Sequence, residues 1–493
     1  MSKFLFLFLI TYCLSNGWTQ VDTLNSIEKA FRTFKSDYAL KNASISFQVV
    51  RLKDKKVIAE YNPNQSMVSA STMKVVTTAT ALEILGSYKK FETQLLYSGH
   101  IDSNCVLHGD IIIKGGGDPT LGSKYFYKNQ SALMHNWADD IAKLGIHKIE
   151  GRIIADASYF SDEYVPSTWS WGDMGNYYGT GVSGLNIYDN TLKFNFSSGP
   201  KNGDSTVIEC IEPYCPGLTI DNRVKAGKTK KDLAYIYGGP FDQYRLIKGT
   251  IPMGVSDFIV KGSMHDPAYV AAFELESILW KMDIPVSKTA TTNRNLEMFE
   301  NEKISSELNL ISKIESPSIS KIVYWTNLIS NNLFAETLLR QIGKKKYKDG
   351  SVFSSTLAVQ KFWKSKDVVL NGFYMNDGSG LSRSNAISAR NLVQILEYMK
   401  TKSKYKDSFY SSLPIAGKTG TLKSYGRKTA IQGNLRAKSG TMTRVKSFAG
   451  YVKDKSGENL AFAIIVNNHT CTTYQIGKKL EKLMISLGNY SDS

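Results

Sequence analysis

Histidine and cysteine are both scarce in this chain. Its 493 residues include six histidines and five cysteines, and the sequence has no Cys-x-x-Cys or histidine-rich spacing of the kind that binds zinc. We therefore expect neither a metal site nor a cofactor. Cys210 and Cys215 are close enough in sequence to form a disulfide. The sequence leaves open whether they are bridged or are free, small apolar residues.

Long apolar runs are also missing. The run Phe4–Leu14 follows Lys3 and is too short to span a bilayer, which is typical of a secretory signal. We therefore predict a signal peptide over residues 1–20 and an exported protein. No later segment has the apolar length of a transmembrane helix.

Acidic residues are fewer than basic residues in this chain. The chain has 61 lysine and arginine residues against 44 aspartate and glutamate residues, a formal net charge of +17. Such a surface attracts polyanions, which for an exported protein are wall polymers or anionic lipids. Peripheral association with a membrane or with wall polymers is therefore an open option. Lysine-rich runs such as 344–348 lack a nucleic-acid-binding motif, so we expect no nucleic-acid partner.

The two ends of the chain contain the clearest patterns of secondary structure. A chain of this length needs more than one core, and its 42% hydrophobic content is that of a folded protein. Strands are predicted at 43–52, 57–61, 435–443, 445–452 and 460–466, and helices at 71–86, 332–342, 388–400 and 475–487. We expect both ends to pair in one antiparallel sheet with helices packed against it, an α/β (α+β) fold.

The segment between residues 74 and 330 is far longer than a connection within one domain requires. It contains strand-like runs at 106–114, 148–155 and 192–196 and a glycine-rich turn at 115–119. We predict a domain formed by 21–95 and 295–493. We also predict an inserted β-rich region at 96–294 that comprises two domains.

The first chemical motif is Ser71-Thr72-Met73-Lys74 at the start of a predicted apolar helix. Ser-x-x-Lys also occurs at Ser26, Ser87, Ser318 and Ser403. Ser71 is favoured because apolar residues follow it at helical spacing. On a helix Ser71 and Lys74 share a face, so Lys74 can serve as the base where histidine is scarce. To do so Lys74 must be neutral, and a second cation, Lys438, is the candidate that lowers its pKa.

The second motif is Ser330-Asn331-Asn332. Ser330 is a candidate for passing a proton to the leaving amine, and Asn332 for holding a substrate amide. Ser330 directly precedes a predicted helix, so the alternative is that its side chain is an N-terminal cap.

The third motif has two spellings, Lys438-Ser439-Gly440 and Lys418-Thr419-Gly420. We favour Lys438 because it lies in a predicted strand that can line a cleft, whereas Lys418 follows Pro414 in a loop. Ser439 has a hydroxyl that can bind a substrate carboxylate. Gly440 allows close approach of the backbone, and the N–H groups of Ser71 and Thr441 are the candidate oxyanion hole.

These motifs, in this order, resemble those of the low-molecular-mass class C penicillin-binding proteins, the D-alanyl-D-alanine carboxypeptidase/endopeptidase (peptidase S13) family. The resemblance covers nearly all of the chain after the signal and extends to segments 109–110, 115–121, 186–190, 377–383 and 413–417. It implies a transpeptidase/β-lactamase-like domain split by inserted domains. It also implies periplasmic action on peptidoglycan stem peptides, an acyl-enzyme at Ser71, and β-lactams as covalent inhibitors.

Two residues depart from the family pattern. The third motif has Ser439 at its centre, and the second has Asn331 where members often have aspartate. Neither change removes a catalytic group. Substrate preference is open, including the balance between carboxypeptidase and endopeptidase.

Two other functions are compatible with the sequence. A class C type β-lactamase or esterase uses Tyr-x-Asn as its second motif, which Tyr188-Asp189-Asn190 spells. A catalytically idle, wall-binding scaffold would keep the motifs but use its basic surface and inserted domains to hold partners.

Overall fold

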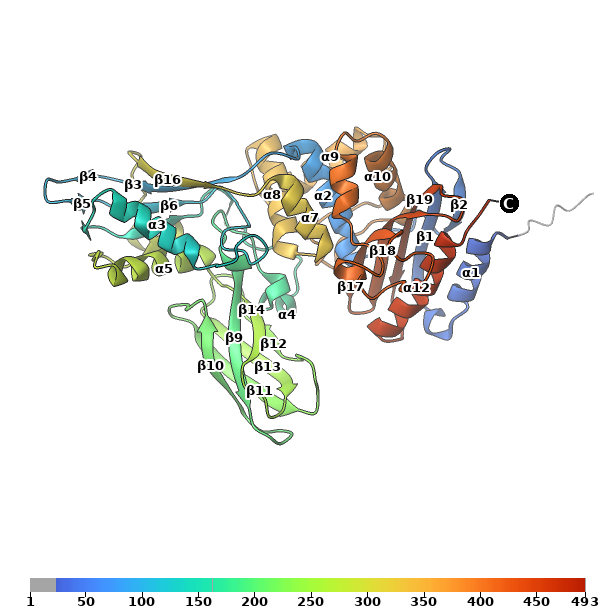
Figure 1. The fold of residues 1–493 in the computed structure, drawn as a ribbon, viewed down its shortest axis with the longest axis horizontal. Coiled ribbons are helices and arrows are strands. Elements are labelled where there is room, and N and C mark those ends of the chain that lie inside the picture. The colour runs from blue at the N-terminus through green and yellow to red at the C-terminus, as the bar shows by residue number, and fades with distance from the viewer. Residues whose placement is uncertain (1–23, 162, 493) are drawn as a thin grey trace, which may run out of the picture.

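The computed structural model describes residues 24–161 and 163–492. The predicted signal peptide, residues 1–20, lies outside this part of the chain. Figure 1 shows an elongated molecule with a body at one side, formed by both ends of the described chain, and an insertion at the other. The insertion consists of a sheet with helices and, below it in this view, a lobe of β-strands.

The body is built on an antiparallel sheet with the strand order β17-β18-β19-β1-β2. Its strands are β1 (Ser44–Arg51), β2 (Val57–Tyr61), β17 (Arg436–Met442), β18 (Val445–Lys453) and β19 (Asn459–Asn467). Strand β1 pairs with β19 along its whole length, from Ser44 opposite Asn467 to Arg51 opposite Leu460. The prediction that both ends of the chain share one antiparallel sheet is therefore confirmed.

One face of this sheet is covered by α1 (Ser26–Lys35) and α12 (Thr473–Gly488). Helix α1 buries Phe31 and Phe34 and begins with a capping box of Asn25 and Glu28. The ring of Phe31 stacks on that of Phe47 in β1, with ring centroids 4.9 Å apart. This core therefore joins residues that lie more than 400 positions apart in the sequence.

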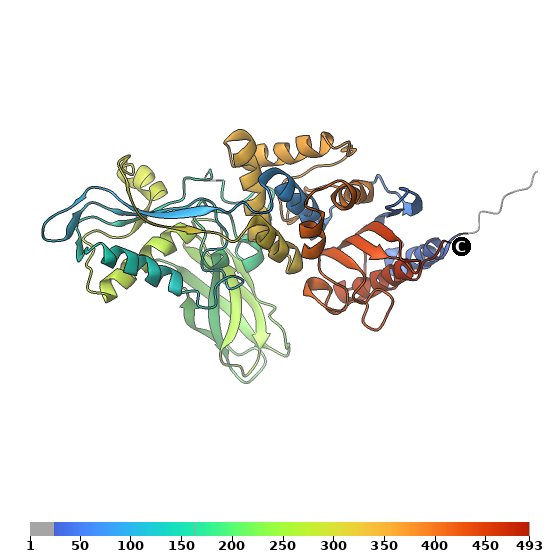
Figure 2. The same cartoon turned by 45° about the horizontal axis from the view of Figure 1, so that its top comes forward.

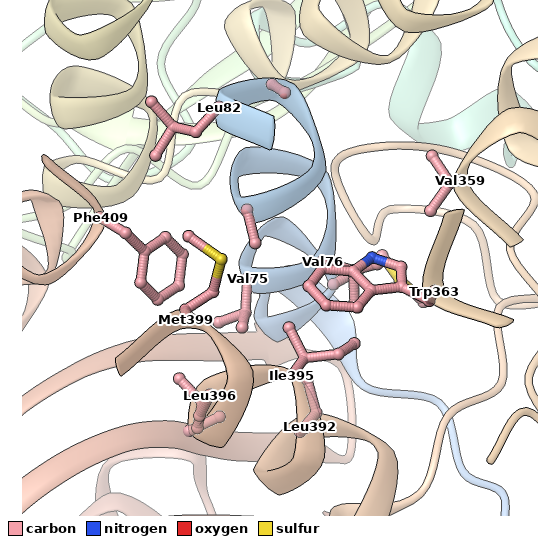
Figure 3. Packing of buried hydrophobic residues seen from close by; sticks show 14 of the residues in the cluster. Val75, Val76, Leu82, Val359, Trp363, Leu392, Ile395, Leu396, Met399 and Phe409 are labelled. Atoms are coloured by element: carbon pink, nitrogen blue, oxygen red, sulfur yellow. The ribbon is translucent and has the colours of Figure 1, made fainter. Parts of the chain in front are cut away.

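The other face of the sheet carries the helices that surround α2 (Figures 1 and 2). They are α2 (Met73–Leu85), α7 (Ile319–Leu328), α8 (Asn332–Tyr347), α9 (Val352–Lys364), α10 (Ala389–Thr401) and α11 (Lys406–Ser412). Every residue of α2 from Met73 to Leu82 is buried. Figure 3 shows Val75 and Val76 packed among Trp363, Met399 and Phe409. A helix that is buried on all sides provides a rigid platform for the residues at its start.

The insertion begins with a mixed sheet in the order β15-β8-β6-β3-β16 and a smaller sheet β4-β5-β7. Its elements are β3 (Glu92–Tyr97), β4 (His100–Ile101), β5 (Val106–His108), β6 (Ile111–Lys114), β7 (Lys148–Ile149), β8 (Ile153–Asp156), β15 (Thr291–Thr292), β16 (Asn309–Glu315), α3 (Ala132–Lys143), α5 (Pro267–Lys281) and α6 (Asn293–Asn295). The domain borders at 95/96 and 294/295 remain a prediction, but β3 and β16 extend this sheet past both of them.

The strand-like runs 106–114 and 148–155 do form β-structure, and each is two strands. The first breaks at Gly109 and Asp110, where a Cβ on Gly109 would come within 2.0 Å of the carbonyl oxygen of Ser98. The Asp110 carboxylate accepts a hydrogen bond from the Arg152 N–H at 2.9 Å, next to the break in the second run. The two chain segments therefore change sheets at the same place, which apolar alternation does not reveal.

The β-strand lobe completes the insertion. It contains sheets β10-β9-β14 and β11-β13-β12, formed by β9 (Thr191–Ser198), β10 (Thr206–Glu212), β11 (Thr219–Gly227), β12 (Tyr235–Tyr237), β13 (Tyr244–Pro252) and β14 (Phe258–Ser263), with α4 (Trp171–Met174) alongside. The strand expected at 192–196 lies within β9. Helices α3 and α5 in the other part were not predicted. Apolar residues lie around most of the circumference of α5, so its sequence shows no amphipathic period.

Two further expectations concern export and cysteines. Within residues 24–161 and 163–492, none of the helices has the length and apolar character needed to cross a membrane. Cys210 and Cys215 are not bridged. The buried sulfur of Cys215 instead lies 3.3 Å from Nδ1 of His265.

Candidate active site

Ser71 lies in the 3-10 turn Ala70–Thr72, directly before α2. Ala70 has a left-handed backbone with φ of 48°, a conformation that is strained for a residue with a side chain. The turn is held by the Ser69 carbonyl oxygen, which accepts from Thr72 Oγ1 at 2.8 Å and from Ser447 Oγ at 2.6 Å. Strand β18 therefore clamps the turn that presents the Ser71 hydroxyl.

Lys74 is one turn further along and fully buried. Its ammonium nitrogen Nζ donates to Ser71 Oγ at 3.0 Å, to Asn332 Oδ1 at 2.6 Å and to the Ser379 carbonyl oxygen at 2.7 Å. Each proton of the ammonium group therefore has an acceptor. Burial lowers the pKa of Lys74 to about 7, against the opposing effect of nearby carboxylates. A large fraction of this amine is thus neutral at neutral pH.

Ser330 and Asn332 lie on the opposite wall, at the start of α8. The helix cap is Asn331, whose side chain accepts from the Phe334 N–H at 3.0 Å. Ser330 is therefore not the cap that the alternative interpretation required. Its backbone is left-handed, with φ of 62°, and its hydroxyl accepts a hydrogen bond from Lys438 Nζ at 2.9 Å.

Lys438 projects from β17 and is also fully buried. Its Nζ donates to Ser330 Oγ and, at 2.7 Å, to the carbonyl oxygen of Ser439. Burial, together with the neighbouring Lys74 and Lys446, holds the pKa of Lys438 well below its ordinary value. The sequence suggested that Lys438 lowers the pKa of Lys74. In the structure burial is the main cause of the lowered pKa of Lys74, as it is for Lys438.

The rival motif lies elsewhere. Lys418 is exposed on a turn, and the hydroxyl of Thr419 accepts from the Ile415 N–H at 2.9 Å. Neither residue lines the cavity next to Ser71. The geometry therefore brings Lys438, and not Lys418, into contact with Ser330.

Gly440 lies where β17 touches the Ser71 turn. A Cβ at this position would come within 2.2 Å of Ser447 Oγ, 2.5 Å of the Ser69 carbonyl oxygen and 3.0 Å of the Ser71 nitrogen. Only glycine therefore allows the strand to approach the turn so closely. Thr441 follows it and lines the same cavity as Ser71.

The hydroxyls of Ser439 and Thr441 have partners on another side of β17. Ser439 Oγ donates to Thr421 Oγ1 at 2.9 Å, and Thr441 Oγ1 accepts from Lys446 Nζ at 2.6 Å. Lys446 is mostly buried, which lowers its pKa to about 8. Ser439, Thr441 and Lys446 therefore place hydroxyl groups and a basic side chain together beside β17.

Two buried carboxylates below Lys74 were not predicted as site residues. Glu336 accepts from the N–H groups of Gly378 and Ser379 at 3.0 and 2.6 Å. Burial, with the nearby Asp377, raises the pKa of Glu336 to about 7. Glu336 follows Asn332 by four residues, so helical spacing from the second motif was the signal that could have found it.

Asp377 is the centre of the loop that supplies the Ser379 carbonyl oxygen. Its carboxylate accepts from the N–H groups of Gly380 and Ser382 at 2.8 and 2.6 Å. It also accepts from Asn385 Nδ2 at 2.6 Å and, from the insertion, from Trp169 Nε1 at 2.9 Å. These bonds fix the acceptor that faces Lys74.

A cavity of about 830 Å³ opens beside these groups, between the body and the insertion. Its lining includes Ser71, Ser330, Asn332, Thr441, Arg383, Asp173, Tyr177, Tyr178, Tyr188, Lys124, Lys193 and Lys261. Asn332 Nδ2 donates to the carbonyl oxygen of Tyr178 at 2.7 Å. The insertion therefore forms one wall of the cavity and contacts the second motif directly.

Tyr188, the tyrosine of the Tyr-x-Asn string, also lines the cavity. Its hydroxyl donates to Glu274 at 2.8 Å, and burial and this carboxylate raise its pKa. Within residues 24–161 and 163–492, Tyr188 has no hydrogen bond with Ser71 or Lys74. It is therefore not arranged as the base of a class C type β-lactamase.

A family model for the D-Ala-D-Ala carboxypeptidase 3 (S13) family matches residues 28–487. The chain belongs to this family. The resemblance seen in the sequence is therefore confirmed, and with it the enzyme class, a serine-type D-Ala-D-Ala carboxypeptidase.

Curated S13 relatives agree with this assignment. The D-alanyl-D-alanine carboxypeptidase of Actinomadura sp. (strain R39) is 25% identical over 460 residues, which are 91% of this chain and 82% of the relative. The D-alanyl-D-alanine carboxypeptidase DacB of Haemophilus influenzae is 25% identical over 434 residues, covering 87% of this chain and 86% of the relative.

The fold of this S13 chain is also that of a solved structure. Penicillin-binding protein 4 (dacB) from Haemophilus influenzae superposes with a TM-score of 0.77 at 22% identity, covering 94% of this chain and 98% of the other. The same protein has been solved in complex with a β-lactam, with a TM-score of 0.73 at 20% identity. The predicted fold, a sheet flanked by helices with inserted domains, is confirmed.

Proposed function

We propose that this S13 protein is a penicillin-sensitive D-Ala-D-Ala carboxypeptidase or endopeptidase that acts on peptidoglycan stem peptides through an acyl-enzyme at Ser71. The observation that carries the proposal is the 3.0 Å contact of Lys74 Nζ with Ser71 Oγ at the wall of the cavity. A buried amine with a pKa of about 7 can take the proton that an ordinary lysine cannot.

In acylation, Lys74 removes the proton of the Ser71 hydroxyl and Oγ attacks the carbonyl carbon of the penultimate D-alanine. The negative charge that forms on the carbonyl oxygen is stabilised by the N–H groups of Ser71 and Thr441. Ser330 then delivers a proton to the amide nitrogen as the peptide bond breaks. Its hydroxyl takes up in turn the proton that Lys74 received from Ser71, which leaves Lys74 neutral again, and the hydrogen bond from Lys438 at 2.9 Å orients the Ser330 hydroxyl for this transfer.

Substrate binding falls to the groups around β17 and α8. Asn332 holds a side-chain or backbone amide of the stem peptide, while Lys438 and the hydroxyls of Ser439 and Thr441 attract the terminal carboxylate. Arrival of a carboxylate favours the charged form of Lys438, which in turn favours the neutral form of Lys74. Binding of the substrate therefore increases the fraction of Lys74 that is neutral and can act as the base.

Hydrolysis completes the cycle when water attacks the ester at Ser71 and the serine regains its proton. In a carboxypeptidase the first leaving group is free D-alanine. In an endopeptidase it is the amine of a second stem peptide across a cross-link. The size of the cavity and its extension along the insertion are compatible with the larger leaving group.

We also place the protein outside the cytoplasm, in the periplasm. The charge and apolar pattern of residues 1–20 supports export, and the substrate of the proposed reaction is a wall polymer. Fusion of residues 1–30 to a reporter enzyme that is active only after export tests this location. Activity that persists when Phe4–Leu14 is replaced by polar residues would contradict it.

Labelling with a fluorescent penicillin tests the acyl-enzyme. Wild-type protein is expected to become labelled, and Ser71→Ala to remain unlabelled while keeping its melting temperature. Ser87→Ala is a suitable control because Ser87 heads another Ser-x-x-Lys string. An unlabelled wild type would favour the idle scaffold, and loss of label in Tyr188→Phe would favour the β-lactamase type of site.

Mass spectrometry of the products distinguishes the two peptidases. A cross-linked muropeptide dimer whose acceptor stem is a pentapeptide contains both bonds, the terminal D-Ala-D-Ala bond and the cross-link. Loss of one alanine mass indicates carboxypeptidase action, whereas conversion of the dimer into monomers indicates endopeptidase action.

A further inference from the structure

An exposed group of aromatic side chains adjoins the cavity and has no role in the proposed reaction. We propose that Trp171, Tyr235 and Tyr237, called here the aromatic platform, bind the sugar rings of the glycan strand that carries the stem peptide. This inference rests on the proposed function, because it supplies a subsite for the same substrate.

The platform combines two elements of the insertion. Trp171 begins α4, and its ring centroid lies 4.9 Å from that of Tyr237 in β12. Tyr235 and Tyr237 are two positions apart in the strand, so both point outward while Ile236 between them is fully buried. Figure 1 shows α4 and β12 at the end of the β-strand lobe that faces the body.

Two of these rings are exposed although their size favours burial, and Tyr237 is half-buried. Trp171 is 57% exposed and Tyr235 is 51% exposed. Exposed aromatic residues that gather at one place mark an interaction surface. Around them, Lys248 lies above the ring of Tyr237, with Nζ 5.7 Å from its centroid.

The platform is continuous with the catalytic cavity. Asp173, two residues after Trp171, lines the cavity together with Tyr177 and Tyr178. Tyr178 connects the two regions, because its hydroxyl donates to Asp173 of α4 at 3.2 Å and its carbonyl oxygen accepts from Asn332. A ligand that leaves the cavity past Tyr178 therefore reaches the platform.

The chemistry of the platform matches a sugar polymer better than a second protein. Flat rings with phenol and indole groups stack on the apolar faces of pyranose rings and donate hydrogen bonds to their oxygens. A four-residue stem peptide reaches about 13–14 Å when extended, so the glycan strand must run close to the mouth of the cavity that holds the stem. The platform shares helix α4 with Asp173, which lines that cavity.

Binding of peptide-free glycan chains tests this assignment. The variant carrying Trp171→Ser, Tyr235→Ser and Tyr237→Ser is expected to bind such chains about tenfold or more weakly than wild type. Its rate of acylation by penicillin and its activity on free stem peptides are expected to stay within twofold of wild type. Its activity on intact peptidoglycan is expected to fall together with glycan binding.

Two controls separate this effect from unfolding. Tyr38, Phe353 and Tyr474 are 87%, 76% and 73% exposed on the body, and serine at these positions is expected to leave glycan binding unchanged. The variant with Trp171→Tyr, Tyr235→Phe and Tyr237→Phe keeps the rings and is expected to restore binding to near the wild-type value.

The outcomes are distinguishable from those of the proposed function. Ser71→Ala is expected to bind the glycan like wild type, so the platform can be measured without catalysis. Glycan binding that is absent in wild type, or equal in wild type and the serine variant, would overturn the inference. Equal losses on free stem peptides and on intact peptidoglycan would also overturn it, because they indicate a damaged cavity or a site for another partner.

Discussion

Lys74 is the residue on which the chemistry of the site depends. It is buried with acceptors for all its protons, above a pair of carboxylates, Glu336 and Asp377. Burial favours the neutral amine and the carboxylates favour the ammonium ion. The balance leaves this group able to change its charge near neutral pH, which is what a base that later returns its proton requires.

A pH profile follows from this balance. The reactive form of Lys74 is the neutral one, so the rate of acylation by penicillin is expected to rise with pH and to level off above the pKa of about 7. Below it, the rate is expected to fall about tenfold per pH unit. Stopped-flow labelling between pH 5 and 9 measures this profile. A rate that is constant from pH 5 to 7 would contradict Lys74 as the base.

The assignment of the third motif is testable at the same scale. Lys438→Ala is expected to reduce the rate of acylation about 10²–10³-fold, because it removes the cation next to Ser330. Lys418→Ala is its matched control, since that side chain is exposed on a turn and its loss is expected to change the rate less than twofold. Equal effects of the two substitutions would refute the assignment.

At the scale of single residues, the sequence predicted the motifs but not their supports. Ser71, Ser330 and Lys438 could be singled out because their residue types and surroundings indicate chemistry. Glu336 lies one helical turn after Asn332 and Asp377 lies in a segment of the family resemblance, but neither was assigned a role, because a glutamate in a helix and an aspartate before a glycine have ordinary explanations on the surface. Their burial is a property of the assembled core.

Among the elements, the start of α8 shows most clearly how a short stretch of sequence positions site residues. Asn331 caps the helix, which leaves Ser330 outside it in a left-handed conformation and starts the helix at Asn332. The cap therefore sets the directions of the two side chains that flank it. An aspartate at this position can accept the same hydrogen bond.

The cap predicts a graded effect on stability. Asn331→Ala is expected to lower the free energy of unfolding by about 1 kcal/mol, because the Phe334 N–H loses its acceptor. Asn331→Asp is expected to keep most of the wild-type stability, because a carboxylate can accept the same hydrogen bond. Urea denaturation of both variants measures the difference. If alanine proves as stable as wild type, the cap does not hold this end of the helix.

Sequence patterns were most reliable for the strands and helices of the body. Strands β1, β2, β17, β18 and β19 and helix α12 lie close to their predicted ranges. Helices α3 and α5 were missed, and apolar residues lie around most of the circumference of α5. The strand-like runs of the insertion are interrupted near Gly109 and Gly151, where the chain passes from one sheet to another. These interruptions depend on close contacts between distant segments of the chain.

At the scale of the whole molecule, the insertion is attached to the site by side chains rather than by strand pairing. Trp169 donates to Asp377, Asn332 donates to Tyr178, and Gln341 donates to the carbonyl oxygen of Gly116 at 2.9 Å. Each of these bonds joins the insertion to the loop or helix that positions Lys74. We therefore expect the insertion to support the position of Lys74 without supplying a reacting group.

This coupling predicts an effect of a distant tryptophan. Trp169→Phe removes a hydrogen bond to a buried carboxylate and is expected to cost about 1.5–3 kcal/mol in stability. It is also expected to slow acylation, because the loop of Ser379 loses a support. Trp280→Phe is the control, since Trp280 is 53% exposed on α5. Calorimetry and penicillin labelling check both effects, and identical results for the two variants would argue against the coupling.

The pairing of β1 with β19 has a consequence for biogenesis. A ribosome releases β1 hundreds of residues before it releases the strand that flanks it on one side. Until then β1 has only β2 beside it, while the insertion can already bury its own apolar residues, since its core draws on none of the last 170 positions. The enzyme therefore acquires its reactive centre last, after translation has reached the final strand.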